Sequence, residues 1–306
     1  MKSFEEIYEK VCSNSKERLK QVKNKNNKFL LTVTIIAIIL NICIYIFADE
    51  KYIITLTVSL SVCLIIFLMT TASKIYRKIY KGTVIDCLIK EYNEKLNFDQ
   101  TGGIPRMEYR ISNFDNNVDD YFSEDRIYGR LKNGEPIQIA EVATYDVEEY
   151  VDSEGNRREE RTETFRGMYG IVRLNKNVQS EIKVATNFNI KRFSNNRIEV
   201  DSAEFEKYYD LFTQDKVTAM RIFTSDLIEK YIDIINISDR PFEVKIQDNL
   251  IFFRFRCGQM FEPPTFSDGL NENLIRKYYK MIFYPMEVIE KTVENINNVA
   301  EEDLQQ

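Results

Sequence analysis

The residues that could carry out chemistry are few, and their spacing matches no standard catalytic site. The sequence has no histidine, which removes the commonest general base, the commonest neutral metal ligand and every Ser–His or Cys–His nucleophile pair. The segment GRLKNG, residues 129–134, lacks the spacing and the following helix of a phosphate-binding loop. We therefore expect no catalytic residues, no bound cofactor and no enzyme activity, with a reaction run by carboxylates alone as the alternative.

The acidic segment DNNVDDYFSED, residues 115–125, comes nearest to a metal site. An EF-hand loop needs Gly at its sixth position and a bidentate Glu at its twelfth. Counted from Asp115, those positions hold Asp120 and Arg126. The pattern fails, so we expect a solvated loop here and no metal ligands.

The cysteines show no paired spacing, which argues against both a disulfide framework and a zinc site. Unpaired thiols suit a reducing cytosol. Cys257 ends an apolar segment beside Gly258, and we interpret it as a buried structural thiol rather than a reactive one. The five cysteines are Cys12, Cys43, Cys63, Cys87 and Cys257.

Two apolar runs determine where the rest of the chain lies. Residues 29–47 and 52–72 contain 19 and 21 residues without a formal charge, and a helix needs about 20 residues to cross the hydrocarbon of a bilayer. Core helices of a soluble protein would be shorter and would carry charge on one face. A cleavable signal peptide would have a shorter apolar run nearer the N-terminus. We therefore predict a two-span transmembrane hairpin over residues 29–72.

Positive charge gathers at one end of each run. Lys and Arg crowd positions 16–28 and 74–81, whereas the turn between the runs offers only Lys51 beside two acidic residues. Such an excess of Lys and Arg is typical of cytoplasmic loops. The pattern predicts a multi-pass protein of the inner (plasma) membrane, with both termini cytoplasmic and the lipid bilayer as a partner.

Asn41 is a strongly polar residue inside the first run. Polar groups in a span often bond to a partner helix, so Asn41 could serve a homo-oligomer. It could equally be satisfied within the hairpin, by Ser61 or Cys63.

The segments that flank the spans show apolar stripes at helical spacing. We expect a cytoplasmic juxtamembrane helix over 1–28 and a cytoplasmic stalk helix over 73–98, paired as an antiparallel coiled coil with residue n beside residue 100 − n. Two helices lying separately on lipid headgroups are the alternative. The stripes contain Phe4, Ile7, Val11, Leu19 and Val22, with a break at Ser15, and then Ile75, Ile79, Ile85, Leu88, Tyr92 and Leu96.

Residues 99–306 are expected to form one cytoplasmic α+β domain, with helices packed against an antiparallel sheet. Alternating apolar residues on both sides of a polar tip predict a long hairpin, whose charged end at 148–163 is either plain solvent-exposed ribbon or a docking arm. The segments PFEVKI and NLIFFRFR, separated by QDN, predict a second, tight hairpin.

The remaining pattern in this domain indicates helices. Asp201, with Glu204 three residues later, forms a capping box that should open a short helix. A break is expected near Thr224, and a last helix over about 271–302 should be kinked at Pro285. The net charge of the chain is −6, of which residues 99–306 contribute −12 against basic flanks. A domain this acidic argues against nucleic acid as a partner.

Three segments carry a resemblance to a known family. They are TFRGMYGIVRLNKNV, VDSAEFEKYYDLFTQDKVTAMRIFTSDLIEKYIDI and DNLIFFRFRCGQMFEPP. Over roughly residues 75–290 the chain resembles a family of bacterial membrane proteins, domain of unknown function 3137. The resemblance implies two N-terminal spans followed by a cytoplasmic α+β domain, and a LemA-like membrane protein as a partner. It implies no catalytic or cofactor-binding residues.

These observations favour a membrane-anchored cytoplasmic binding or scaffold module without catalytic activity. The expected partners are the lipid bilayer, a protein that the sequence does not name and a second copy of the chain. The alternative is a ligand-sensing membrane effector, whose oligomerised spans would permeabilise the bilayer.

Overall fold

The computed structural model describes residues 3–47, 51–115, 118–152, 155–187, 196–238, 241–263, 270–300 and 304. The chain divides into two compact units. The helical unit contains residues 1–87 and 262–276, and the sheet unit contains residues 88–261 and 277–306. The predicted fold class is confirmed. The chain is mixed helix and sheet, with two N-terminal apolar helices, an antiparallel sheet and a long C-terminal helix.

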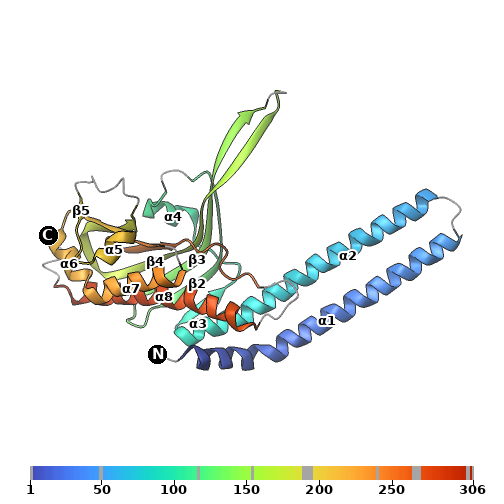
Figure 1. Cartoon of the computed structure of the whole chain (residues 1–306), viewed down its shortest axis with the longest axis horizontal. Helices are drawn as coiled ribbons and strands as arrows, with labels where there is room; N and C mark the ends of the chain where they lie inside the picture. Colours follow the sequence, from blue (N-terminus) through green and yellow to red (C-terminus); the bar gives the residue numbers. More distant parts are fainter. Residues whose placement is uncertain are drawn as a thin grey trace. The chain divides into compact units, whose positions relative to one another are not determined.

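Two long antiparallel helices make up most of the helical unit (Figure 1). They are α1 (Phe4–Phe47) and α2 (Lys51–Tyr80). No Gly or Pro occurs between residues 3 and 81, so no residue type interrupts the helical hydrogen bonds. A capping box opens α1, because the Ser3 hydroxyl accepts from the Glu6 N–H and the Glu6 carboxylate accepts from the Ser3 N–H, both at 3.2 Å.

Side-chain hydrogen bonds fix the register of this hairpin. In each bond, the two residue numbers add up to within two of 100, which matches the expected pairing of residue n with residue 100 − n. The amide nitrogens are the donors: Asn41 Nδ2 to Ser61 Oγ at 2.8 Å, Asn26 Nδ2 to the Ala72 carbonyl at 3.2 Å, and Asn14 Nδ2 to Cys87 Sγ at 3.5 Å.

The second flank differs in detail from one helix over 73–98. After α2 the backbone passes through a π-helix, η1 (Lys81–Ile85), and then through α3 (Asp86–Tyr92) to strand β1, which begins at Leu96. The apolar stripes also differ. Ser15 is fully buried and continues the stripe that it was expected to break, whereas Ile75 is 48% exposed.

Seven antiparallel strands form one sheet in the order β1-β2-β3-β4-β6-β5, with β7 pairing along β4. The long hairpin is confirmed as β3 and β4, whose ends project from the sheet as a two-stranded ribbon of residues 146–151 and 157–162 (Figure 1). The strands are β1 (Leu96–Asp99), β2 (Asp120–Arg130), β3 (Pro136–Val151), β4 (Arg157–Thr186), β5 (Arg197–Ile198), β6 (Tyr209–Thr213) and β7 (Phe242–Phe255).

The second predicted hairpin is wrong. PFEVKI and NLIFFRFR are successive parts of the one strand β7, and both pair with β4. Asp248 of the intervening QDN has a left-handed φ of 54°, which Asp tolerates better than most residues. It bends the strand where the register against β4 shifts, around Val178, instead of turning the chain back.

Five helices complete the described fold. A break between α6 and α7 at Thr224 is confirmed, and Pro285 lies inside α8. The cap of α5 is Ser202, whose side chain accepts from the Phe205 N–H, so the prediction of Asp201 as N-cap is wrong by one residue. The helices are α4 (Arg106–Ser112), α5 (Ala203–Tyr208), α6 (Lys216–Ile222), α7 (Ser225–Ser238) and α8 (Glu272–Asn298).

Aromatic side chains fill both faces of the sheet. On one face, Tyr109 of α4 packs on Tyr169 of β4 with ring centres 4.7 Å apart, in a cluster that includes Phe252. The adjacent residue of β7, Phe253, faces the opposite way. It contacts Phe242, which in turn contacts Tyr231 of α7. The sheet is therefore a buried layer that holds the ends of β4, β6 and β7 in place.

Candidate functional sites

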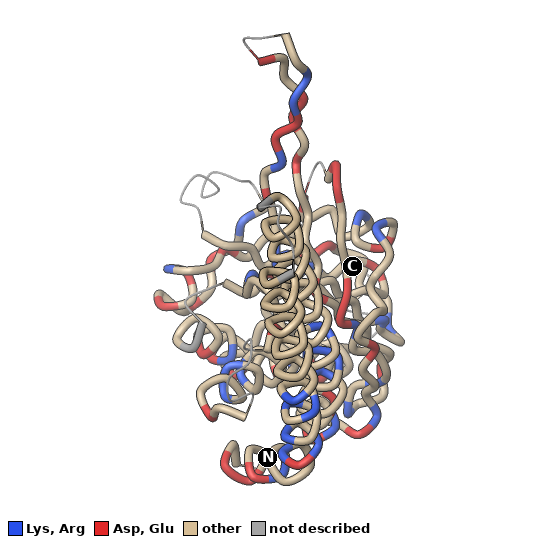
Figure 2. Tube along the Cα trace, turned by 90° about the vertical axis from the view of Figure 1, so that its right-hand side faces the viewer, with Lys and Arg blue, Asp and Glu red and all other residues tan. Residues whose placement is uncertain are grey.

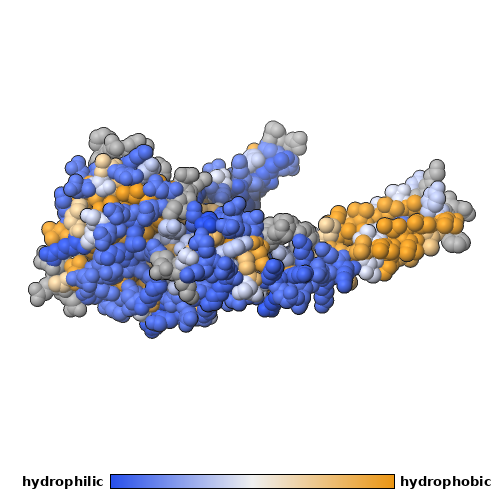
Figure 3. Space-filling model, turned by 60° about the horizontal axis from the view of Figure 1, so that its bottom comes forward, coloured by the Kyte–Doolittle hydropathy of each residue, from blue (hydrophilic) through white to orange (hydrophobic). Residues whose placement is uncertain are grey.

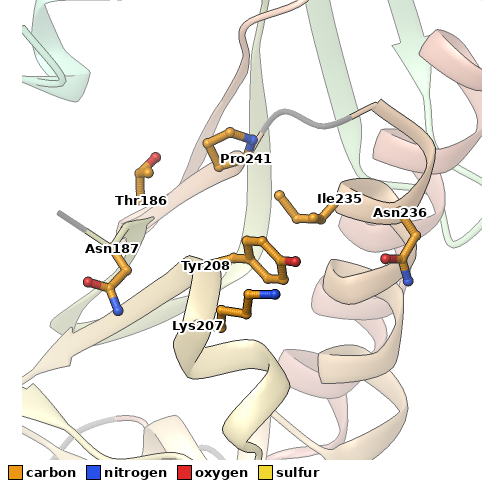
Figure 4. A pocket seen from close by; sticks show the side chains of 7 residues that line it. All are labelled: Thr186, Asn187, Lys207, Tyr208, Ile235, Asn236 and Pro241. Carbon is orange, nitrogen blue, oxygen red and sulfur yellow. The ribbon is translucent and has the colours of Figure 1, made fainter. Parts of the chain in front are cut away.

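A polar cavity of about 320 Å³ lies in the sheet unit, where the end of β4 meets α5 and α7 (Figure 4). Figure 4 shows side chains of both helices and of β4 around one space. The lining residues are Thr186, Asn187, Lys207, Tyr208, Ile235, Asn236 and Pro241.

Hydrogen bonds hold the β4 side of this cavity. The Thr186 hydroxyl and N–H both donate to Glu243 at 3.2 Å, and Asn187 donates from its N–H to the Tyr208 carbonyl at 2.9 Å. Lys207 Nζ lies 4.9 Å from the ring centre of Tyr208, and a hydrogen bond to that residue raises the pKa of Lys207. The lining thus offers an ammonium group, amides and an aromatic ring. The ammonium and amide groups can donate hydrogen bonds to a polar or anionic group, and among the described lining residues no base lies beside a nucleophile.

The densest charge network of the sheet unit surrounds Arg254. Its guanidinium donates to Glu243 and, at 2.7 Å, to Asp115, and it lies 4.8 Å from the ring centre of Phe114. Burial alone would raise the pKa of Glu243. The charge of Arg254 and the hydrogen bonds from Arg254 and Thr186 together outweigh burial and lower it. Every charge here has a partner, so the network holds structure rather than a reactive group.

The acidic segment 115–125 is not one solvated loop. Residues 120–125 belong to β2, and Asp125 is fully buried at a β-bulge with a φ of 56°. There it joins Glu124 and Glu141, all three offering carboxylate oxygens within 4.8 Å of one another. Glu141 accepts from the Met260 N–H at 2.8 Å and has Arg166 at 3.6 Å. Within this cluster, a protein donor and a protein cation therefore already contact Glu141.

Cys257 is half-buried, and desolvation raises the pKa of its thiol to about 12. The thiolate, which is the reactive form, is therefore scarce at neutral pH. This agrees with a structural thiol. All five cysteines are free thiols.

On the face seen in Figure 3, an apolar band covers one end of the helical unit. It consists of the exposed side chains of residues 29–46 and 52–72, with exposed fractions from 42% at Met69 to 86% at Tyr52. In the most apolar 18-residue window of each helix, only 6% of α1 and none of α2 is buried. Both helices are long and apolar enough to cross a membrane. Figure 2 shows Lys and Arg gathered on both helices next to this uncharged stretch.

Asn41 lies between the two helices of the band. Its amide nitrogen donates to the Ser61 hydroxyl at 2.8 Å and to the Ala37 carbonyl at 2.7 Å. Of the two partners expected within the hairpin, Ser61 is therefore the one used, and Cys63 is exposed. Beside the amide, an apolar groove of about 420 Å³ runs between the helices.

Sequence patterns did not identify three of these features. Glu141 stands 16 positions after Asp125 in the sequence, and only the β2–β3 pairing brings the two carboxylates together. Of the three, only the charge network could have been inferred from the sequence. Arg254 lies inside the apolar run NLIFFRFR, and an arginine buried there must have polar partners. The cavity around Lys207 depends on the packing of α5, α7 and β4, which no local pattern encodes.

Comparisons with known proteins give one family match. Residues 163–292 match the family model DUF3137, a protein of unknown function. No curated protein sequence matches the chain. A solved structure that is similar to it is the mycobacterial trehalose monomycolate transport factor A, with 9% sequence identity and a TM-score of 0.34. That alignment covers 68% of this chain and 94% of the other.

Proposed function

We propose, taking residues 163–292 as a domain of unknown function 3137, that the chain is a membrane-anchored binding or scaffold module. Its spans anchor it in the inner membrane, and its sheet unit lies in the cytoplasm and binds a partner without catalysing a reaction.

The observation that carries the proposal is the bare apolar band. A core helix of a soluble protein covers its apolar face, whereas most apolar side chains of residues 29–46 and 52–72 are exposed. Contiguous apolar surface of this extent marks a protein or membrane interaction site. Its uncharged length fits the hydrocarbon thickness of a bilayer, and the polar residues inside it are hydrogen bonded within the helices.

Several features of the sheet unit support the proposal of binding rather than catalysis. The chain has no histidine, the buried charges around Arg254 and Glu141 are paired, and the thiol of Cys257 is not activated. The cavity around Lys207 is lined by both polar and apolar side chains. The partner that the family resemblance implies, a LemA-like membrane protein, is the first to test.

The anchoring is tested by alkaline carbonate extraction and by cysteine labelling. In a variant without native cysteines, Glu50→Cys and Ser153→Cys are exposed in turn to a membrane-impermeant maleimide applied to intact cells. We expect the chain to stay in the membrane pellet and position 50 alone to react. Release by carbonate, or reaction at position 153 without position 50, would contradict the proposal.

The scaffold role is separated from a pore-forming effector by membrane potential. Expression of the full chain should leave the potential unchanged, while crosslinking in native membranes should trap a protein partner. Lys207→Glu reverses the charge of the cavity, and the exposed Lys216→Glu is the matched control on the same unit. Depolarisation on expression would favour the effector. If both variants trap the partner equally, the cavity is not part of the surface that binds the partner.

A further inference from the structure

The Asn41 amide has one group without a partner. Its oxygen Oδ1 is buried and accepts no hydrogen bond within the described part of the chain. Both N–H groups are used, one on Ser61 and one on Ala37. If the band lies in a bilayer, as the proposed function requires, no water reaches this acceptor, and an unsatisfied amide oxygen is unfavourable in hydrocarbon.

One of the two donor bonds can be exchanged at little cost. In an α-helix the carbonyl of residue 37 already accepts from the backbone N–H of residue 41. The bond from Asn41 Nδ2 to that carbonyl is therefore a second one, and its loss leaves no backbone group unpaired. The bond to Ser61 can stay in place. The amide thus has one donor and one acceptor to offer outside its own hairpin.

The groove beside Asn41 leaves room for a neighbouring helix. Ala37 and Ser61, two small residues, form its floor next to the amide, and small residues let helices approach closely. Ile38, Ile42 and Val62 form its rim and are about half exposed. No lining residue carries a charge, so a second helix meets no repulsion within the band.

We propose that two copies of the chain pair along this groove, with the Asn41 amides of the two copies hydrogen bonded to each other. A two-fold axis along the membrane normal places the same residue of both copies at the same depth. Each amide can then give one N–H to the other's oxygen and receive one in return, which satisfies both acceptors. Other hydroxyls of the band, among them Thr34, Thr57 and Ser59, donate to carbonyls of their own helices. A second copy therefore supplies the required amide without any further partner.

The test uses the full-length chain in phosphatidylcholine liposomes, with donor- and acceptor-labelled copies mixed for energy transfer. Asn41→Leu should weaken association about three- to tenfold, the size expected for one or two interhelical hydrogen bonds in a membrane. Ser59→Ala, an exposed hydroxyl bonded to its own helix, is the matched control and should change nothing. Ser61→Ala removes the bond within the hairpin but keeps the amide, so it should retain transfer.

Crosslinking locates the interface independently. Ile38→Cys, in a variant without native cysteines, should form a disulfide between copies. A variant retaining only Cys43, which lies about 200° round the helix from Asn41, should not. Unchanged transfer in Asn41→Leu, or crosslinking through Cys43 in preference to position 38, would overturn the pairing. A chain that fails to float with the liposomes contradicts the membrane anchor instead, so the two failures are distinguishable.

Discussion

In the α1–α2 hairpin, large apolar side chains point outward and an amide–hydroxyl bond lies inside. In the sheet unit, aromatic side chains lie inside and charge lies on the surface. Tyr52 and Leu31 are 86% and 62% exposed, while Tyr169 and Phe253 are fully buried. The same residue types are thus placed in opposite ways within one chain. This opposite placement is what the proposed membrane anchor requires, since the hairpin would then face lipid and the sheet unit water.

Polar groups inside the two regions form hydrogen bonds, but the hairpin uses neutral groups and the sheet unit uses charged ones. In the hairpin, Asn41 and Ser61 bond across the seam with neutral groups. In the sheet unit, Arg254 bonds to two carboxylates, because charges can be assembled where the folding chain begins in water. Apart from the Asn41 oxygen, these polar groups have hydrogen-bond partners, and what distinguishes the two regions is whether the bonds use charge.

The largest effect should come from breaking the charge network of the sheet unit. Arg254→Met leaves Glu243 and Asp115 half-buried or buried without their cation, and removing one partner of such a pair costs about 3–5 kcal/mol. Urea unfolding of the detergent-solubilised chain, followed by tyrosine fluorescence, measures the loss. Arg256→Met, exposed and just past the end of β7, is the control and should cost about 0.5 kcal/mol or less. Equal losses in both variants would contradict the network's role.

The second effect compares two exposed apolar residues, one in each region. Ile39→Asp, at a position 54% exposed in the band, should cost about 2.5–3.5 kcal/mol of membrane insertion. Val217→Asp, 62% exposed in α6 of the sheet unit, should change stability by about 0.5 kcal/mol or less, since both states are in water. Carbonate extraction measures the first and urea unfolding the second. Full membrane retention of Ile39→Asp would contradict the prediction that the band lies in lipid while the sheet unit lies in water.

The third effect depends on pH and concerns Glu243, whose pKa is lowered in the folded state. A group with a lowered pKa contributes stability that is complete above its ordinary value of 4.5 and is lost as pH falls through the folded-state pKa. The difference in unfolding free energy between the wild type and Glu243→Gln should therefore be constant at neutral pH. Below pH 4.5 it should shrink, because protonation neutralises the native carboxylate too. A difference that grows in acid would show the opposite sign of coupling.

Long uniform patterns could be predicted from the sequence, and contacts between distant segments could not. The absence of Gly and Pro from residues 3–81, and of charge from residues 29–47 and 52–72, predicts α1 and α2, and the hairpin geometry then sets the register of the Asn41–Ser61 bond. The QDN segment led to the wrong prediction of a second hairpin because its residues suit a tight turn. Tertiary pairing with β4 kept the strand running and left only Asp248 in a left-handed conformation. The residues of QDN allow either a tight turn or a continuous strand, and pairing with β4 determines which one forms.

The same limit applies to the sites. Asp115 was singled out as part of an acidic loop, yet its partner Arg254 stands 139 positions away and is brought close by α4 packing against the sheet. Asp125 is buried because a β-bulge turns it inward next to Glu141. Periodicity locates an acidic residue on a strand, but it does not state which strand lies opposite.

The smallest effect concerns charge at the ribbon, where β3 and β4 pair only with each other. Glu148 lies directly opposite Glu160, and Glu149 directly opposite Glu159. Like charges directly opposite in a sheet are destabilising, and opposite charges contribute about 0.2–1 kcal/mol. Glu160→Lys should therefore stabilise the ribbon by about that amount, although the same kind of charge is costly in the apolar band.

Amide hydrogen exchange of residues 146–151 measures this change, and protection should rise by up to about fivefold, the ratio that 1 kcal/mol gives. Glu160→Gln is the control, because it removes the repulsion without adding an attraction and should give a smaller rise. If protection falls in both variants, the facing glutamates are not repelling one another and the ribbon is held by contacts outside its own two strands. The ribbon would then be a docking arm that contacts a partner's surface, rather than plain solvent-exposed structure.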